Sequence, residues 1–469
     1  MGPVSFVTTL VFVRPEGLSP EGLQVLATTL WIGWWWITEA LPMAASALLP
    51  AIIFPATGAV GATEATAAYA HPMIFLFLGG FVLALAMEKW NLHRRIALSI
   101  LSKVGDHARQ IVLGFMLATG FLSMWISNTA TTVMMLPIGM AVISQMDPSG
   151  QGGDRPSGFG KALMLGIAYS ASIGGIATLV GTPTNPIFVG VAEQLYGEEI
   201  TFAQWMIFGL PISIIMTAVA WWYLTYVAFP LSRSLEGGTD FKAQLKEMGP
   251  MQREEWVILV VFVFVATSWI SRPGTWALLF PSINDTAIAL SGALMLFAWP
   301  ARKGSPVRER IMNWEDTQRL PWGILLLFGG GLSLAQGFKV TGLAQWVGDR
   351  LVVLEGWELI LIILVVVALV NFLTEVTSNV ATCSMILPIL AALAEAIGVH
   401  PFSLMVGATV AASCAFMLPV ATAPNAVVFG SGQLRIPDMA RSGFVLNIVS
   451  IMVITLIVYF VLPQVWGFA

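Results

Sequence analysis

The sequence predicts an all-α, polytopic membrane protein built from two repeats. Of its 469 residues, 57% are hydrophobic and only 10% are charged, whereas soluble domains carry about 25% charged residues. Apolar runs long enough to cross a bilayer, roughly 17 to 25 residues, recur along the chain. Continuous runs such as Leu359–Leu373 lack the alternation of a β-barrel strand. A polar motif also occurs twice, as Ser127-Asn128-Thr129 and as Ser378-Asn379-Val380, which predicts two structural repeats.

Residues 1–70 are expected to hold the N-terminal spans. Gly2–Val13 is apolar but too short to cross a bilayer. Leu23–Ala40 and Leu41–Val60 are predicted as two spans, and the tryptophans at positions 34–36 are typical of a membrane interface.

The first repeat is predicted over residues 71–230 and begins with the span His71–Met87. Gln110–Met146 contains no charged residue. As one helix it would be about 55 Å long, nearly twice the roughly 30 Å hydrocarbon core. Split at Ser127, it gives two helices of about 24 Å each. We therefore predict a re-entrant hairpin at 110–146 with the polar motif at its tip, because non-helical backbone at membrane depth must be enclosed by protein or by a water-filled cavity. A pair of full spans is the alternative.

A broken helix is predicted after this hairpin. Lys161–Leu179 runs into a stretch at 181–186 that holds two prolines, a glycine and three polar side chains within apolar surroundings. Such a composition favours an unwound helix. Phe202–Phe229 completes the repeat.

Residues 231–320 are predicted to form a cytoplasmic linker with the connecting spans Trp256–Ile270 and Ala287–Trp299. The loops at 91–109, 231–255 and 301–320 hold most of the lysines and arginines, whereas the loop at 192–201 is acidic. The positive-inside rule therefore places the basic loops in the cytoplasm.

The second repeat is predicted over residues 321–469. It contains a hairpin at 359–394, a broken helix near 421–425 after Phe402–Val420, and the final span Phe444–Val461. Ser378, Asn379 and the following Leu387-Pro388-Ile389 each lie 251 residues after their counterparts in the first repeat. If the hairpins do not cross the membrane, five crossings separate Gly79 from its counterpart Gly330. An odd number makes the repeats inverted.

Two hairpin tips and two helix breaks would bring hydroxyls, amides, free carbonyls and helix ends together at the membrane midplane. Helix N-termini suit an anion, and carbonyl, hydroxyl and amide oxygens suit a small hard cation such as sodium. No lysine or arginine lies near either motif, so bound cations would help to hold a carboxylate. These residues predict a sodium-coupled secondary transporter. Packing between helices is the structural alternative for each polar residue alone, and Glu39 and Glu375 are the acidic candidates within apolar stretches.

Other classes of protein have less support in the sequence. No nucleophile–base pair, metal cluster or phosphate-binding loop is recognisable, so we expect no enzyme and no cofactor. The two cysteines lie in apolar segments and the four histidines are scattered, which indicates neither a disulfide framework nor a metal site. The charge distribution gives no basis for nucleic-acid binding. An ion channel that uses the same polar cavity is a further alternative.

The ordered set of motifs resembles the divalent anion/sodium symporter family from about Leu18 to the C-terminus. The motifs are the two polar tripeptides, the string from Trp35 to Pro42, and the breaks Gly181–Asn185 and Ala421–Asn425. The resemblance implies a multi-pass cell-membrane protein, a homodimer, and a fixed scaffold domain that includes residues 1–70. It also implies a moving transport domain that works by an elevator mechanism. The implied activity is sodium-coupled symport of C4-dicarboxylates such as succinate, malate and fumarate; sodium-independent exchange, or transport of citrate or sulfate, is the alternative.

The same resemblance assigns site residues. The first sodium would be bound by Ser123, Ser127, Asn128 and the carbonyl of Gly181, and the second by Thr374, Ser378, Asn379 and the carbonyl of Ala421. The substrate would meet Ser127, Asn128, Thr129, Thr182, Ser378, Asn379, Val380 and Thr422. Val380 replaces the threonine of the first motif, and Ala423 stands where many family members have proline, so both positions bear on the identity of the substrate.

Overall fold

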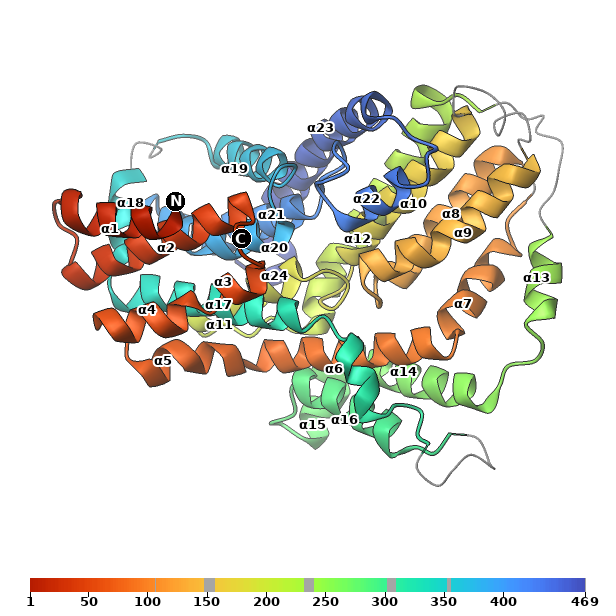
Figure 1. Cartoon of the computed structure of the whole chain (residues 1–469), viewed down its shortest axis with the longest axis horizontal. Helices are drawn as coiled ribbons and strands as arrows, with labels where there is room; N and C mark the ends of the chain where they lie inside the picture. Colours follow the sequence, from red (N-terminus) through yellow and green to blue (C-terminus); the bar gives the residue numbers. More distant parts are fainter. Residues whose placement is uncertain (106, 147–156, 232–239, 302–308, 352–355, 469) are drawn as a thin grey trace.

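The protein is a bundle of helices in a computed structural model that describes residues 1–105, 107–146, 157–231, 240–301, 309–351 and 356–468 (Figure 1). Across these ranges the only β-type pairing is an isolated bridge between Pro300 and Arg310. Seven of the helices in this part of the chain are long and apolar enough to cross a membrane. The predicted all-α class is therefore confirmed.

The N-terminal region contains two long helices and several short ones. Their bounds are α1 (Gly2–Phe12), α2 (Pro20–Thr38), α3 (Met43–Ser46), α4 (Leu49–Thr57) and α5 (Ala62–Ala67). The predicted span Leu41–Val60 is interrupted in the structure, because Ala47 and Leu48 separate the short helices α3 and α4. Pro42 directly precedes α3 and Pro50 lies in the first turn of α4, and neither supplies the N–H donor that a continuous helix needs. Trp36 Nε1 donates to Ser46 Oγ at 3.0 Å, which fastens α3 to the end of α2.

The two repeats have the same order of elements. The first consists of α6 (Pro72–Lys89), α7 (Leu92–Leu101), α8 (Ala108–Ser123), α9 (Asn128–Met146), α10 (Gly158–Gly175), α11 (Thr184–Tyr196) and α12 (Phe202–Trp222). The second consists of α17 (Trp322–Val340), α18 (Leu343–Leu351), α19 (Leu359–Leu373), α20 (Asn379–Ala396), α21 (Pro401–Ala412), α22 (Ala423–Phe429) and α23 (Ile436–Phe460).

Between the repeats lie α13 (Phe241–Glu247), α14 (Arg253–Ser271), α15 (Ala277–Leu279) and α16 (Asp285–Ala298), and α24 (Leu462–Trp466) ends the chain. The predicted basic linker falls partly outside the described residues, which omit Arg233, Arg302, Lys303 and Arg308. α16 packs closely on α6: a Cβ added to Gly79 would lie 2.7 Å from the carbonyl carbon of Ala289.

Both predicted hairpins are present as helix–turn–helix pairs. α8 and α9 are joined by residues 124–127, and α19 and α20 by residues 374–378, so each polar motif lies at a hairpin tip. How deep these tips lie in a bilayer stays a prediction.

The helix breaks begin earlier than the sequence suggested. The segment between α10 and α11 covers residues 176–183, and the segment between α21 and α22 covers residues 413–422. Pro186 and Pro424 lie in the first turns of α11 and α22. Proline is tolerated there because the N–H groups of the first turn have no intrahelical partner. The prolines therefore mark where each helix restarts, and the non-helical residues precede them.

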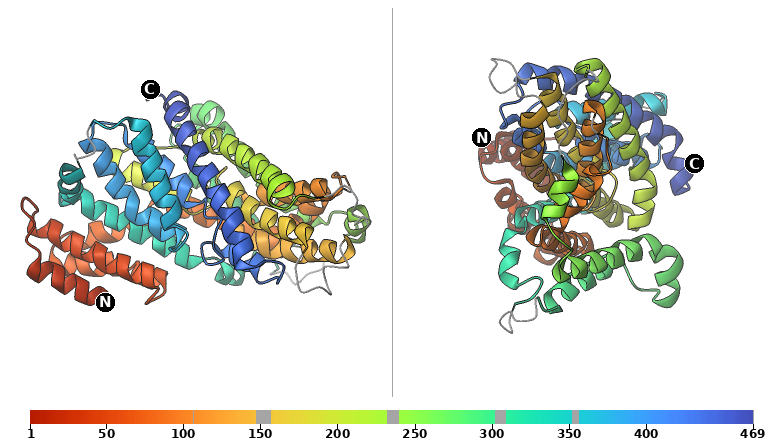
Figure 2. Two further views of the ribbon diagram at one scale, coloured as in Figure 1. Left: turned by 90° about the horizontal axis from the view of Figure 1, so that it is seen from above. Right: turned by 90° about the vertical axis from the view of Figure 1, so that its right-hand side faces the viewer.

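The two repeats interlock through their broken helices. α11 packs against α20 and α21 of the second repeat, whereas α22 packs against α9 and α10 of the first. Figure 1 shows α22 beside α10. Figure 2 shows the elongated molecule, with the N-terminal helices at one end and the α8–α9 hairpin toward the other. Each repeat thus completes its packing with a helix from the other.

Candidate functional site

A cavity of about 670 Å³ lies where the two hairpin tips meet the two helix breaks. All the predicted substrate residues line it: Ser127, Asn128, Thr129, Thr182, Ser378, Asn379, Val380 and Thr422. The carbonyl-bearing residues Gly181 and Ala421 line it as well. Glu39 is the charged residue among the described lining residues, and no lysine or arginine is among them. The cavity wall therefore combines polar groups with apolar side chains and is nearly uncharged by side chain.

Four helices begin at this cavity. α9 starts at Asn128 and α20 at Asn379, while α11 follows Pro183 and α22 follows Thr422. The first N–H groups of a helix lack intrahelical partners, and the helix dipole makes this end positive. The cavity therefore offers backbone donors and positive potential to an anion without a basic side chain.

Four oxygen atoms cluster behind the first hairpin tip. Ser123 Oγ lies 2.6 Å from both Asn128 Oδ1 and the carbonyl oxygen of Ala171. Asn128 Oδ1 also lies 3.1 Å from the carbonyl oxygen of Gly181 and 3.2 Å from that of Ala171. Either the amide turns so that its nitrogen donates to these oxygens, or a cation is shared among them. Hydroxyl, amide and backbone oxygens are the donors that a sodium ion uses at broken helices.

A glycine makes the first cluster possible. Gly175 is the last residue of α10, and a Cβ at this position would lie 2.7 Å from Asn128 Oδ1 and 3.1 Å from the carbonyl oxygen of Gly181. Both atoms belong to the cluster, so a larger residue would displace it. Position 175 therefore requires glycine for close approach.

The second repeat forms an equivalent cluster. Thr374 Oγ1 lies 2.7 Å from Asn379 Oδ1 and 3.1 Å from the carbonyl oxygen of Ala412. Ser123 and Thr374 are both fully buried and lie behind the cavity wall. The predicted sodium residues are thus brought together in two groups, and their contacts with ions stay a prediction.

Two asparagines that sequence reasoning left without a role hold the breaks in shape. Asn185 Nδ2 donates to the carbonyl oxygens of Gly175 at 3.2 Å and Thr178 at 2.7 Å. Asn425 Nδ2 donates to those of Ala415 at 3.2 Å and Leu418 at 3.0 Å. Both side chains are fully buried. Asn185 and Asn425 each stand four residues after the start of their break motif, at Gly181 and Ala421, and this equal spacing is the sequence signal that could identify them.

Glu375 supports the second break from behind the cavity wall. Its Oε1 accepts hydrogen bonds from the backbone N–H of Phe416 at 2.8 Å and of Met417 at 2.9 Å, and Oε2 accepts one from Leu418 at 3.1 Å. Asn447 Nδ2 donates to Oε1 at 2.7 Å. These donors satisfy both oxygens of the carboxylate. Glu375 is therefore a support for the loop, whereas Glu39 lies on the cavity wall.

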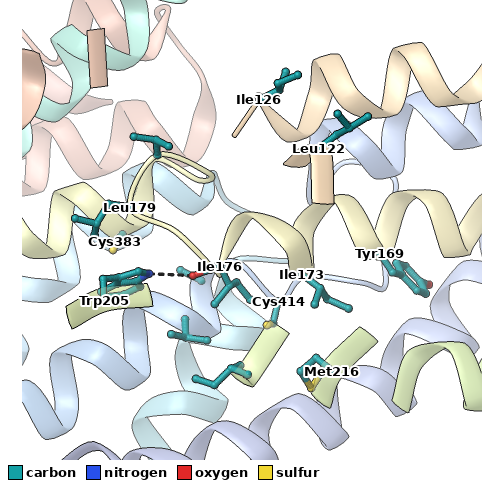
Figure 3. Close-up of a cluster of buried hydrophobic side chains, with 14 of the residues drawn as sticks. Leu122, Ile126, Tyr169, Ile173, Ile176, Leu179, Trp205, Met216, Cys383 and Cys414 are labelled. Atoms are coloured by element: carbon teal, nitrogen blue, oxygen red, sulfur yellow. Dashed lines mark hydrogen bonds between the residues drawn. The ribbon is translucent and has the colours of Figure 1, made fainter. Parts of the chain in front are cut away.

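The first break is fixed by an apolar cluster and an indole. Trp205 Nε1 of α12 donates to the carbonyl oxygen of Ile176 at 2.9 Å (Figure 3). Ile173, Ile176 and Leu179 are fully buried around it. The bond to Trp205 and the apolar cluster therefore hold the start of this break in place.

A helical membrane protein whose two broken helices and two hairpins enclose a cavity of neutral oxygens and helix N-termini belongs to the class of secondary transporters. Comparison identifies the family within this class. The model described as "Sodium:sulfate symporter transmembrane region" matches residues 3–466. The chain belongs to this family and is a multi-pass protein of the cell membrane.

Named relatives and solved structures agree with this assignment. The sodium-dependent dicarboxylate transporter SdcS of Staphylococcus saprophyticus is 48% identical over 476 residues, which cover 100% of this chain and 91% of that protein. The SdcS of Staphylococcus aureus is 47% identical over 475 residues with the same coverage.

Two solved structures share the fold at 12% sequence identity. The YdaH transporter of Alcanivorax borkumensis has a TM-score of 0.60 and covers 94% of this chain and 99% of its own. The efflux pump MtrF of Neisseria gonorrhoeae has a TM-score of 0.59 and covers 97% and 98%, respectively.

Proposed function

We propose that this protein takes up C4-dicarboxylates such as succinate, malate and fumarate by sodium-coupled symport. The observation that carries the proposal is the pairing of two neutral oxygen clusters with four helix N-termini around one cavity. The clusters have the donors that sodium prefers, and the helix N-termini suit carboxylates. The naming of the SdcS relatives as sodium-dependent dicarboxylate transporters supports the same substrate class.

In this proposal Asn128 and Asn379 serve both ligands. Each amide oxygen would bind a sodium ion together with the hydroxyl of Ser123 or Thr374, while the amide N–H group faces the substrate. The first sodium would also contact Ser127 and Gly181, and the second Ser378 and Ala421. Sodium bound in these clusters lowers the cost of bringing a dianion into a cavity without basic residues. Binding of the cation and of the anion is thereby coupled.

The substrate would span the two hairpin tips. One carboxylate would meet Ser127, Asn128, Thr129 and Thr182, and the other Ser378, Asn379 and Thr422. Val380 faces the same cavity with methyl groups where Thr129 has a hydroxyl. The second half of the site therefore has one donor fewer, which suits a small dicarboxylate better than a citrate with additional polar groups.

We further propose that the interlocked unit of hairpins and broken helices moves as one body against a scaffold that includes residues 1–70, with the protein working as a homodimer. The exchange of α11 and α22 between the repeats supports a single moving body, because neither hairpin can move without the other. The resemblance described above supports the elevator movement and the dimer.

Succinate uptake into proteoliposomes, with and without an inward sodium gradient, tests the proposal. We expect accumulation only with sodium, and loss of uptake in Asn128→Ala and Asn379→Ala. Uptake that is independent of sodium and needs internal dicarboxylate would show an exchanger and overturn the sodium coupling. Flux that never accumulates succinate against its gradient would show a channel. If citrate or sulfate competed more strongly than malate, the preferred substrate would not be a C4-dicarboxylate.

A further inference from the structure

Two buried hydrogen bonds join the helices that flank the first break to the second break. Thr184 Oγ1, at the start of α11, lies 2.9 Å from Ser413 Oγ in the second break. Tyr169 Oη of α10 donates to the carbonyl oxygen of Phe416, also in the second break, at 2.9 Å. The rings of Tyr169 and Phe416 are in edge contact with centroids 5.0 Å apart. At most 1% of each of these four residues is exposed, so water does not compete for the bonds. Figure 3 shows Tyr169 on the same helix as Ile173, which leads into the first break.

Each of these bonds starts beside one oxygen cluster and ends beside the other. Thr184 precedes Asn185, whose amide fastens the first break to Gly175 and Thr178. Ser413 follows Ala412, whose carbonyl oxygen contacts Thr374 in the second cluster. A shift of either break therefore strains the hydrogen bonds at the other.

The hydrogen bond from Tyr169 is also connected to the second oxygen cluster, through Phe416 and Glu375. Phe416 accepts the Tyr169 hydroxyl through its carbonyl oxygen and donates its N–H to Glu375, the residue after Thr374. Tyr169 thus holds one side of the second-break backbone while Glu375 holds the other. The conformation of this loop depends on both repeats.

The connection is asymmetric. At the 240-residue spacing of the break motifs, Thr409 and Pro424 stand where Tyr169 and Thr184 stand in the first repeat. The Thr409 hydroxyl donates within its own helix, to the carbonyl oxygen of Met405 at 2.7 Å, and proline has no hydroxyl, so neither residue makes the reverse bond. Both connections therefore run from helices that flank the first break to the loop of the second.

We propose that Tyr169 and Thr184 are positioning residues that couple the two cation sites, so that a cation ordering one break lowers the cost of binding a cation at the other. This inference depends on the proposed sodium-coupled function. Ordering of a shared element is sufficient for positive cooperativity, and the coupling is reciprocal even though the bonds run one way.

The test measures succinate uptake as a function of sodium concentration at saturating succinate. Tyr169→Phe and Thr184→Val each remove the bridging hydroxyl, and Thr184→Val also removes a long 3.4 Å hydrogen bond to Asn185 Oδ1. Ser170→Ala is the matched control, because this buried hydroxyl on α10 donates within its own helix, to Gly166 at 2.6 Å. Since one hydrogen bond contributes little net stability, we expect both test variants to fold.

The wild-type protein and the control should show a sigmoidal sodium dependence. In both test variants the Hill coefficient should fall toward one and half-saturating sodium should rise about three- to tenfold, with the maximal rate at saturating sodium retained. The melting temperature of the purified protein, measured against sodium concentration, gives a second readout, since binding stabilises the folded state.

An unchanged Hill coefficient and unchanged half-saturating sodium in both variants would overturn the coupling. So would a variant that melts at a lower temperature without sodium but keeps the wild-type sodium dependence, because its hydroxyl would then be merely structural. Sodium-independent uptake by the wild-type protein would overturn the proposed function, which separates the two failures.

Discussion

At the scale of single residues, the site depends on close contacts that only small or amide side chains allow. Asn128 and Asn379 occupy equivalent places at two hairpin tips, each within 2.7 Å of a buried hydroxyl. An aspartate would add a negative charge beside backbone carbonyls. A leucine of similar size would remove the amide oxygen from the cluster. The amide is therefore the side chain that fits a neutral oxygen cluster.

Gly175→Ala should abolish sodium-dependent uptake while leaving the protein folded. The added Cβ would lie 2.7 Å from Asn128 Oδ1 and must displace that side chain. Uptake and sodium-dependent thermal stabilisation measure the effect. Gly120→Ala on α8 is the control, because its Cβ would lie 3.5 Å from the nearest atom, the carbonyl oxygen of Ser170, at an ordinary contact distance. Normal sodium dependence in Gly175→Ala would contradict the role of the first cluster.

Glu375→Gln should destabilise the protein by about 1–3 kcal/mol and raise half-saturating sodium. The carboxamide nitrogen would face a backbone N–H that now donates to a carboxylate oxygen, which leaves a buried donor unsatisfied. Thermal unfolding and sodium-dependent uptake measure the two effects. Glu39→Gln, on the cavity wall, should leave stability unchanged. A Glu375→Gln variant with wild-type stability would exclude the supporting role.

At the scale of elements, each helix break has a defined conformation that the side chain of one asparagine stabilises. Asn425→Ala removes two hydrogen bonds that define the second break, so we expect uptake to fall at least about tenfold as the carbonyl of Ala421 loses its fixed position. Uptake and sodium-dependent thermal stabilisation measure this loss.

The control is Asn284→Ala, which removes one bond to the N–H of Ala287 at the start of α16. Such a cap contributes about 1 kcal/mol, and we expect normal uptake because this bond joins Asn284 only to its own helix. If Asn425→Ala also transported normally, the break geometry would not depend on this amide.

The hairpins and the positions of their tips could be predicted from the sequence, because an uncharged run too long for one span and a repeated polar motif leave few other arrangements. The sequence motifs place the start of each break too late, because proline suits a first helical turn and the unwound residues come before it. The contacts of Asn185, Asn425 and Glu375 could not be predicted, because the carbonyl and N–H groups that they bind become available only when the helices unwind. Likewise, hydropathy alone does not show that Pro42 and Pro50 help to divide this apolar segment into α3 and α4.

At the scale of the whole molecule, the distribution of charge predicts its orientation in the membrane. Glu198 lies in the acidic loop and Lys242 on α13, and both are exposed. With the basic loops in the cytoplasm, a membrane-impermeant thiol reagent added to intact cells should label Glu198→Cys and not Lys242→Cys. The native cysteines at 383 and 414 are buried and should not react. Permeabilised cells, in which both variants should be labelled, provide the control. The reverse pattern would invert the orientation.

The exchange of α11 and α22 between repeats also has a consequence for biogenesis. When the ribosome has completed α11, the helices on which it packs, α20 and α21, have not yet been synthesised. The first half of the chain must therefore remain in the membrane with the surface of α9 and α10 uncovered until α22 has been synthesised. The two halves, divided within the linker and produced as separate polypeptides, should each be degraded when expressed alone. When the two halves are produced together, each should protect the other from degradation.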